Sequence, residues 1–361
     1  MEHFNPLLEH TSDHKFITIG EILLRLTPPN YEKIRMASTF EASYGGSEAN
    51  IALALANLGI DSTFFTVVPN NSLGKSAVRM LRSNDVHCTP VILSTPEQTP
   101  THRLGTYYLE TGYGIRPSKV TYDRKHSAFS EFDFSTVDIP ALLKDFTWLH
   151  MSGITPALGE NCKTFVLDCM KTAHEMGLIV SFDGNFRSTL WTWEEARDFC
   201  TECLPYVNVL LGIEPYHLWK DEEDHSKGDV KDGVPLQPSY EQQDEIFQCF
   251  VERYPNLTCI GRHVRYAHSG SENSLKAFMW YQNHTFESKL FTFNILDRVG
   301  GGDAFASGLI YAMMHNYKPM DMVNFAVASS AIKHTIHGDG NVTDDAETIR
   351  NLMNMNYDIK R

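Results

Sequence analysis

The strongest chemical signal in the sequence is a run of three glycines that ends in an aspartate, Gly300–Gly301–Gly302–Asp303. Residues that favour a helix follow at once. Glycines let the backbone approach an anion closely, and the N–H groups and dipole of a helix start stabilise negative charge. An ionised aspartate there can accept the proton of an attacking hydroxyl. The pattern predicts phosphoryl transfer to an alcohol, with Asp303 as general base and Gly300 to Gly302 as anion hole. A glycine-rich loop with an aspartate helix cap is the structural alternative.

A second glycine motif, Tyr44–Asn50, reads Tyr-Gly-Gly-Ser-Glu-Ala-Asn. Together with Asp297–Asp303 it resembles the two signatures of the PfkB (ribokinase-like) carbohydrate kinases, in the order and spacing of that family. The resemblance extends from about Phe16 to Asp339. It implies ATP and Mg²⁺ as cofactors, Asp303 as the base, and contacts with the sugar from Gly45, Gly46 and Asn50.

The C-terminal signature departs from the family pattern at three positions. Many members have Thr and another residue where this chain has Arg298 and Val299, and Ala where it has Gly301. The first change removes a hydroxyl that sometimes lies near the triphosphate. The last still allows an anion hole, because glycine is at least as permissive as alanine.

A third segment indicates the substrate. Phe182–Arg187, followed by Leu190–Trp191, resembles the Asp-x-Asn-x-Arg…Leu-Trp segment of the 2-keto-3-deoxygluconate kinases within this family. The segment ends an apolar strand, which places Arg187 over the ligand crevice of a parallel sheet. Arginine is suited to bidentate capture of a carboxylate, so the resemblance implies a sugar acid, 2-dehydro-3-deoxy-D-gluconate. A surface arginine is the structural alternative.

Further residues on the sugar side follow from the same resemblance. The segments around Arg116 and Arg124 resemble this subfamily and could supply a second cation, and Tyr107 could pack against the sugar. Many family members have an acidic residue near Arg25 that binds neutral hydroxyls, and the opposite charge here is consistent with an acid substrate. Fructokinase, 5-dehydro-2-deoxygluconokinase and a non-catalytic sugar-acid sensor remain alternatives, although a sensor has no need of a base at Asp303.

The residues that we expect to bind the nucleotide are inferred from their positions in the family fold. Arg265 and Asn273 follow the strand at Thr258, where members of the family line the nucleotide pocket, and Gly338 lies in a segment that resembles the subfamily. Glu214 matches the glutamate of an Asn-x-x-Glu motif near the metal–triphosphate, although the asparagine position is apolar here. Ordinary loop residues and a helix-start glutamate are the alternatives.

These residues need a scaffold, which the hydrophobic pattern describes. Short apolar strands alternate with amphipathic helices, which favours a mostly parallel sheet covered on both faces. With the resemblance, this predicts a ribokinase-like three-layer α/β/α domain over residues 15–345. Two extended segments, 22–44 and 101–119, are expected to pair as a small β-sheet lid that excludes water. We interpret residues 1–14 as a tail and 221–238 as a surface insertion.

Composition limits the partners. The chain has 31 Lys+Arg against 45 Asp+Glu, a formal charge of −14, which disfavours nucleic acid and anionic membrane. No apolar stretch approaches the ~20 residues that span a bilayer, and the seven cysteines are scattered, so we expect a reduced, cytoplasmic enzyme with small-molecule partners. Lids pair into dimers in this family, which makes a homodimer possible.

Overall fold

A twisted sheet of nine strands forms the centre of the molecule. The computed structural model describes residues 14–214, 230–231, 234–235, 237–342 and 345–355. Strand order is β16-β15-β14-β11-β10-β9-β1-β4, with β17 also paired to β15. The six strands from β14 to β4 are parallel, and β15, β16 and β17 add an antiparallel edge. Their bounds are β1 Lys15–Ile19, β4 Asp61–Phe65, β9 Trp148–Ser152, β10 Ile179–Asp183, β11 Val209–Leu211, β14 Cys259–Ala267, β15 Glu272–Tyr281, β16 His284–Glu287 and β17 Phe291–Asn294.

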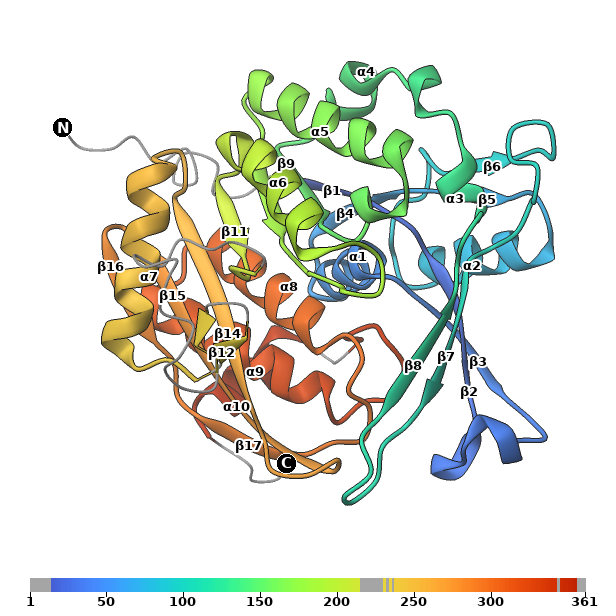
Figure 1. Cartoon of the computed structure of the whole chain (residues 1–361). Helices are drawn as coiled ribbons and strands as arrows, with labels where there is room; N and C mark the ends of the chain where they lie inside the picture. The colour runs from blue at the N-terminus through green and yellow to red at the C-terminus, as the bar shows by residue number, and fades with distance from the viewer. Residues whose placement is uncertain (1–13, 215–229, 232–233, 236, 343–344, 356–361) are drawn as a thin grey trace.

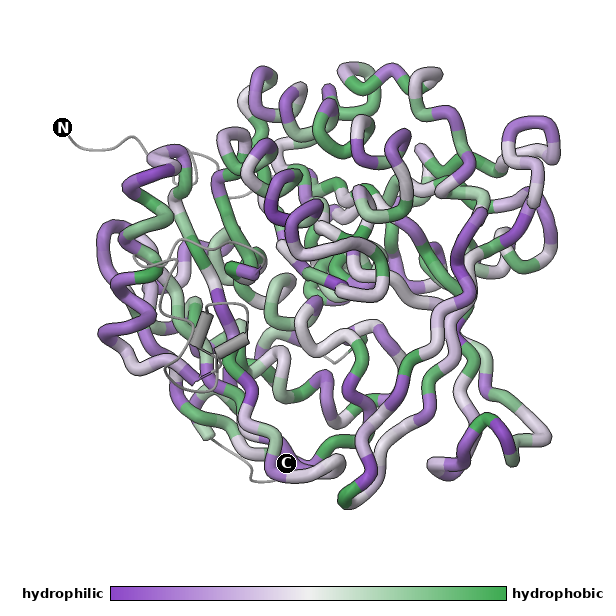
Figure 2. The backbone as a smooth tube through the Cα atoms, in the orientation of Figure 1, coloured by the Kyte–Doolittle hydropathy of each residue, from purple (hydrophilic) through white to green (hydrophobic). Residues whose placement is uncertain are grey.

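Helices cover both faces of this sheet, as Figure 1 shows. Each face buries its own apolar cluster, so the sheet is the shared wall of two cores. Figure 2 shows hydrophobic and hydrophilic residues alternating along the outer helices, the pattern of an element with one buried face. One layer contains α1 Ser47–Asn57, α8 Gly301–Met314, α9 Pro319–Lys333 and α10 Ala346–Met353, and the other contains α3 Ala128–Glu131, α4 Ile139–Leu143, α5 Glu160–Glu175, α6 Trp193–Cys203 and α7 Tyr240–Arg253. A further helix, α2 Ser72–Arg82, packs beside the paired strands β5 Val67–Pro69 and β6 Ile92–Ser94.

The three layers and the mostly parallel sheet confirm the predicted fold class. The predicted boundary at residue 345 falls before α10, whose Ala346, Ile349 and Met353 pack into the core, so the folded domain continues past it. Of the predicted tail, 1–14, the structure describes His14 alone. Most of the predicted insertion at 221–238 lies outside the described residues, which include a short antiparallel pair, β12 Val230–Lys231 with β13 Val234–Pro235. Within the described part of the chain, no helix is long and apolar enough to cross a bilayer.

A separate four-stranded sheet projects from the body and forms the lid. Its order is β3-β2-β7-β8, so the two predicted extended segments do pair. The strands are β2 Leu23–Thr27, β3 Glu41–Gly45, β7 Thr106–Glu110 and β8 Lys119–Asp123, which extends the second segment beyond residue 119. In Figure 1 this sheet stands away from the helical layers at the lower right.

The far end of the lid touches the body again. Gly114, at the tip of the β7–β8 hairpin, donates its N–H to Ser271 Oγ at 2.7 Å and accepts one from Gly270 at 2.6 Å. Gly270 follows β14, and a Cβ there would lie 2.4 Å from the carbonyl oxygen of Arg116. Only glycine allows this approach of two backbones. The lid is therefore anchored at both ends, beside the carboxyl ends of the parallel strands.

Candidate active site

Asp303 lies in the first turn of α8, at the point where two helix starts converge. Its Oδ1 accepts a hydrogen bond from Ser47 Oγ and its Oδ2 accepts one from Asn50 Nδ2, both at 2.7 Å. Ser47 and Asn50 belong to the first turn of α1, so the two glycine motifs meet in space. Burial raises the pKa of the Asp303 carboxyl, while the bonds from Asn50 and Ser47 oppose the rise. Each carboxylate oxygen retains a lone pair for a sugar hydroxyl.

The glycines before Asp303 are required by packing as well as by chemistry. Gly300 has a φ of 81°, in the left-handed region that favours glycine, and a Cβ there would lie 2.0 Å from the carbonyl oxygen of Asp339. A Cβ on Gly301 would lie 2.3 Å from the ring of His334. The alanine of many family members thus gives way to glycine here because the His334 ring fills the space of its methyl group. The N–H groups of this first helical turn have no partner within the helix, so they can bind an anion.

Two histidines next to this loop are uncharged. Burial lowers the pKa of His334 to about 3 and that of His263 to about 3. The Nδ1 of His334 donates a hydrogen bond to the Ser330 carbonyl at 2.7 Å, whereas its buried Nε2 has no partner among the residues that the structure describes. His263 lies against the ring of Phe305 on α8. These rings shape the loop without contributing charge at neutral pH.

Two further carboxyls lie behind Asp303. Glu48 accepts hydrogen bonds from Ser152 and Thr155 at 2.7 Å each, and burial raises its pKa to about 7 despite them. Burial, followed by the charge of Asp303, raises the pKa of Asp183 to about 7. Asp183 Oδ1 also accepts the N–H of Asn185 at 2.9 Å. These carboxyls titrate near neutral pH, so the negative charge around Asp303 depends on pH.

Three arginines with no counter-ion border the same region, and we call them the open arginine group: Arg187, Arg265 and Arg298. Among the residues that the structure describes, none of the three forms an ion pair. Burial, with the nearby cations Arg298 and Arg187, lowers the pKa of Arg265 to about 10, and its buried Nε has no hydrogen-bond partner among the described residues. Arg187 is exposed, yet its charge acts to lower the pKa of both Asp303 and Asp183. Uncompensated cations beside a glycine loop are suited to an anionic ligand.

The other predicted nucleotide residues occupy distinct places. Asn273 is fully buried on β15, and within the described part of the chain neither its Nδ2 nor its Oδ1 has a hydrogen-bond partner. Gly338 donates its N–H to Asp297 Oδ2 at 3.0 Å. Glu214 forms an ion pair with Arg262 at 3.2 Å and keeps about a third of its side chain exposed, at 35%. Among the described residues, no group of three or more His, Cys, Asp or Glu side chains is arranged to hold a metal.

The predicted lid residues are engaged elsewhere in this structure. Arg124 forms a buried ion pair with Glu21. Arg116 lies at the hairpin tip and donates to the carbonyl of Tyr31 at 2.5 Å. The hydroxyl of Tyr107 donates to Asp339. These contacts occupy all three side chains with partners inside the protein.

One expectation needs correction. Arg25 is bound by two carboxylates and is 4% exposed, so its charge is balanced inside the protein and indicates nothing about an acid substrate. Gly45 and Gly46 are also needed for packing, because Cβ atoms there would lie 2.0 Å from Asp339 Oδ2 and 2.2 Å from the Glu21 carbonyl oxygen.

Sequence reasoning missed several residues of the site. Ser47 lies inside the same glycine motif as Asn50, and this shared position was the signal that could have identified it. Asn185 donates to Ser47 at 2.8 Å and links the substrate segment to this network. Lys333 is fully buried below the glycine loop, and nothing in its sequence context distinguishes it from a helix-end lysine.

A mostly parallel sheet, a lid and an aspartate at a glycine-bounded helix start are all features that the sequence motifs led us to expect of a sugar kinase. The pfkB family carbohydrate kinase model matches residues 13–215. The chain belongs to this family, which confirms the resemblance inferred from its motifs.

Several known proteins resemble the chain over nearly its whole length. The solved 2-dehydro-3-deoxygluconokinase of Thermotoga maritima superposes with a TM-score of 0.85 at 35% identity, covering 94% of this chain and 99% of its own. The 2-dehydro-3-deoxygalactonokinase of Haloferax volcanii is 29% identical over 340 residues, 94% of this chain and 96% of that protein. The 2-dehydro-3-deoxygluconokinase of Bacillus subtilis is 26% identical over 329 residues, 90% of each.

Proposed function

We propose that this kinase transfers the γ-phosphoryl group of ATP to the terminal hydroxyl of 2-dehydro-3-deoxy-D-gluconate, giving the 6-phosphate. The observation that carries the proposal is the position of Asp303, held at 2.7 Å by Ser47 and Asn50 at the glycine-bounded start of α8. The names of the Thermotoga and Bacillus relatives support the choice of sugar acid.

Asp303 is the general base in this proposal. It accepts the proton of the sugar hydroxyl as the oxygen–phosphorus bond forms and the bond to ADP breaks. Burial raises its pKa, which strengthens it as a base, and the bonds from Asn50 and Ser47 keep it ionised and oriented. The backbone N–H groups of Gly300 to Gly302 stabilise charge on the transferring group.

The residues present fit a nucleoside triphosphate. Arg265 directs an unpartnered Nε into a buried position, and the first turn of α8 offers free N–H groups. The solved fructokinase of Xylella fastidiosa, similar in fold with a TM-score of 0.69 at 17% identity, contains bound ATP. Mg²⁺ would neutralise the phosphates, held chiefly by them and by water, with Glu214 as the carboxylate available nearby. Asn273 and Gly338 complete the proposed nucleotide side.

Arg187 is the proposed partner of the substrate carboxylate. It follows β10, so it lies at the carboxyl edge of the parallel sheet where ligands bind. Among the residues described, its guanidinium donates one hydrogen bond, to the neighbouring Phe186 carbonyl at 3.2 Å, and its charge acts to lower the pKa of Asp303 and of Asp183. The chain carries a charge of −14, so a diffusing anion needs a local cation to hold it.

The C4 epimer, 2-dehydro-3-deoxy-D-galactonate, is a second candidate. The Haloferax relative acts on it by name and matches this chain at 29% identity. Both acids present the same carboxylate and the same terminal hydroxyl to Arg187 and Asp303, so the proposed machinery serves either.

Product analysis tests the function. The enzyme is incubated with Mg·ATP and one of four substrates: 2-dehydro-3-deoxy-D-gluconate, its C4 epimer, 5-dehydro-2-deoxygluconate or fructose. With the first two it should produce a phosphomonoester on the terminal carbon, detected by phosphorus–proton coupling in NMR. The Asp303→Asn variant is the control. Phosphorylation of fructose at the rate of the acids would contradict the proposed substrate class, and ATP consumption without any sugar product would contradict sugar kinase action.

Assembly through the lid is a separate proposal. All five residues of β8 are exposed, so this edge strand is available to a second copy of the chain. Light scattering that finds a dimer in solution supports it, and a monomer at all concentrations contradicts it.

A further inference from the structure

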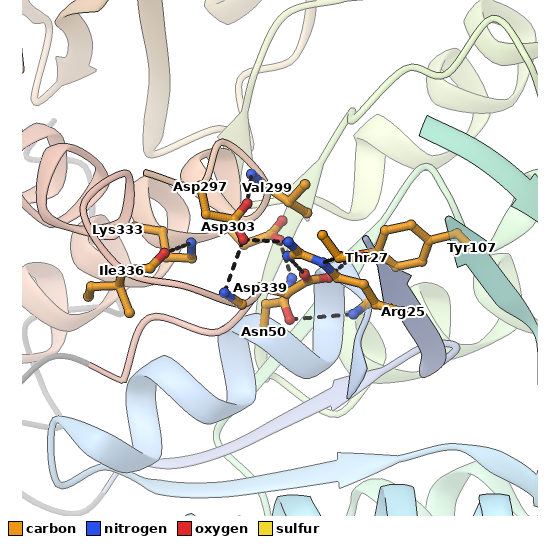
Figure 3. Close-up of polar contacts among 12 residues, drawn as sticks. Arg25, Thr27, Asn50, Tyr107, Asp297, Val299, Asp303, Lys333, Ile336 and Asp339 are labelled. Atoms are coloured by element: carbon orange, nitrogen blue, oxygen red, sulfur yellow. Dashed lines mark hydrogen bonds and ion pairs between the residues drawn. The ribbon is translucent and has the colours of Figure 1, made fainter. Parts of the chain in front are cut away.

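A buried charge cluster joins the lid to the glycine loop. Arg25, on lid strand β2, places Nη2 at 2.5 Å from Asp297 and Nη1 at 2.6 Å from Asp339, and its Nε donates to Thr27 at 2.8 Å. All three guanidinium nitrogens are therefore engaged. Figure 3 shows Arg25 and Tyr107 entering from the lid strands and meeting the two aspartates. We call Arg25, Asp297, Asp339 and Lys333 the latch.

The carboxylates of the latch belong to the loops that shape the anion hole. Asp297 begins the glycine motif, and its Oδ1 accepts the N–H of Val299 at 3.1 Å. The backbone of Asp339 fits directly against Gly300, where no Cβ has room. A displacement of Arg25 would therefore be transmitted to the residues that precede Asp303.

The charges of the latch balance. Lys333 is fully buried and donates to the Ile336 carbonyl at 3.2 Å. Burial lowers the pKa of Lys333, and the charges of Asp297 and Asp339 oppose that shift. Burial opposes the charge of Arg25, yet Asp339 and Asp297 raise its pKa above the ordinary value. Two cations thus face two anions, and Tyr107 supplies a hydroxyl to Asp339. A network satisfied in this way specifies one geometry.

We propose that Arg25 is a positioning residue that couples the seated lid to the anion hole, so that the phosphoryl group passes to the sugar rather than to water. The inference rests on the proposed function of the glycine loop. With the latch formed, the lid excludes water and the loop holds its geometry at the same time. With it broken, the two are independent, and ATP + H₂O → ADP + phosphate competes with transfer to the sugar hydroxyl.

Three variants separate coupling from stability. Arg25→Met leaves Asp297 and Asp339 facing Lys333 alone, so the melting temperature should fall. The double variant Arg25→Met/Asp297→Asn removes one charge of each sign, so the melting temperature should recover in part. Arg103→Met is the control, because Arg103 pairs with Asp123 at 2.9 Å on the lid without touching the glycine loop.

The deciding readout is the ratio of phosphate released to sugar phosphate formed. In Arg25→Met and in the double variant, kcat for transfer should fall about 10–100-fold, because the reacting groups are misplaced. The ratio of phosphate released to sugar phosphate formed should rise about 10-fold. Arg103→Met should match the wild type in both. The role is overturned if the ratio stays at the wild-type value, or if it returns to that value in the double variant together with the melting temperature.

The outcome is independent of the proposed base. Asp303→Asn, assayed in parallel, should lose transfer to the sugar while ATP hydrolysis is unchanged. Both reactions use the loop, but only transfer needs the sugar hydroxyl to be deprotonated. Undiminished transfer in Asp303→Asn would contradict the proposed function, whereas an unchanged ratio in Arg25→Met would contradict the coupling alone.

Discussion

Two groups of charged side chains, the latch and the open arginine group, act on Asp303, and their cations differ in what they bind. In the latch, Arg25 is fully paired with Asp297 and Asp339 at 2.5 and 2.6 Å. In the open arginine group, Arg265 has a buried Nε for which the described residues offer no hydrogen-bond partner. Both groups affect the pKa of Asp303, because Arg187 acts to lower it and Asp339 acts to raise it.

The difference separates structure from binding. A buried cation that is paired by the protein fixes geometry, and removing one partner leaves an uncompensated charge that costs about 3–5 kcal/mol. A cation that the protein leaves unpaired carries an unfavourable energy that a bound anion can relieve. A charged side chain alone therefore does not indicate a ligand site, whereas a cation that the protein leaves without a counter-ion does.

The largest effect should come from the residue between the two groups. Asp303→Asn keeps the size of the side chain and removes the base, so kcat should fall ~10²–10⁴-fold while KM for the sugar changes little. Initial rates with saturating Mg·ATP measure this. A variant with near-normal kcat would show that another group takes the proton.

Replacing a cation should have opposite consequences in the two groups. Arg265→Met removes a partly buried charge without a described counter-ion, so we expect KM for ATP to rise about 10–100-fold, from loss of a charge-assisted bond of about 1.5–3 kcal/mol, with an unchanged or higher melting temperature. Arg25→Met should lower the melting temperature. Calorimetry and ATP titrations on both variants check this contrast, which fails if both lose stability equally.

The buried carboxyls give a smaller, pH-dependent effect. The pKa of Glu48 is about 7 in the folded protein against an ordinary value of 4.5, so the folded protein binds the extra proton between these values. The stabilisation is complete below about pH 4.5 and is lost as pH rises through 7, so melting temperature should decline over this window. Glu48→Gln removes the titration. Relative to wild type, the free energy of unfolding of this variant should increase by about 1.4 kcal/mol for each unit that the pH rises between about 4.5 and 7.

An exposed glutamate provides the control for that experiment. Glu160 has a side chain that is 83% exposed, so Glu160→Gln should leave the pH profile of the melting temperature unchanged. A constant difference between Glu48→Gln and wild type across the window from about pH 4.5 to 7 would contradict the assigned titration of Glu48.

Much of this arrangement could be predicted from local signals, and some could not. The glycine motifs and the alternating strands and helices predicted the family, the sheet, the lid and Asp303, because each depends on residues close in sequence. The partners of Arg25 lie 272 and 314 residues away, so no local pattern could show that its charge is balanced. The clash between a Cβ on Gly301 and His334 is equally a product of tertiary packing.

The central claim is that Arg187, in the open arginine group, holds the carboxylate of a sugar acid next to Asp303. The most direct measurement compares kcat/KM for 2-dehydro-3-deoxy-D-gluconate with that for its neutral primary amide, on the wild type, Arg187→Ala and Arg187→Lys. The account predicts that the wild type prefers the acid by about 10–100-fold, since a charge-assisted pair contributes about 1.5–3 kcal/mol. The preference should vanish in Arg187→Ala and return in part in Arg187→Lys, which lacks the bidentate fork. Equal preference for the acid in all three enzymes would contradict the claim.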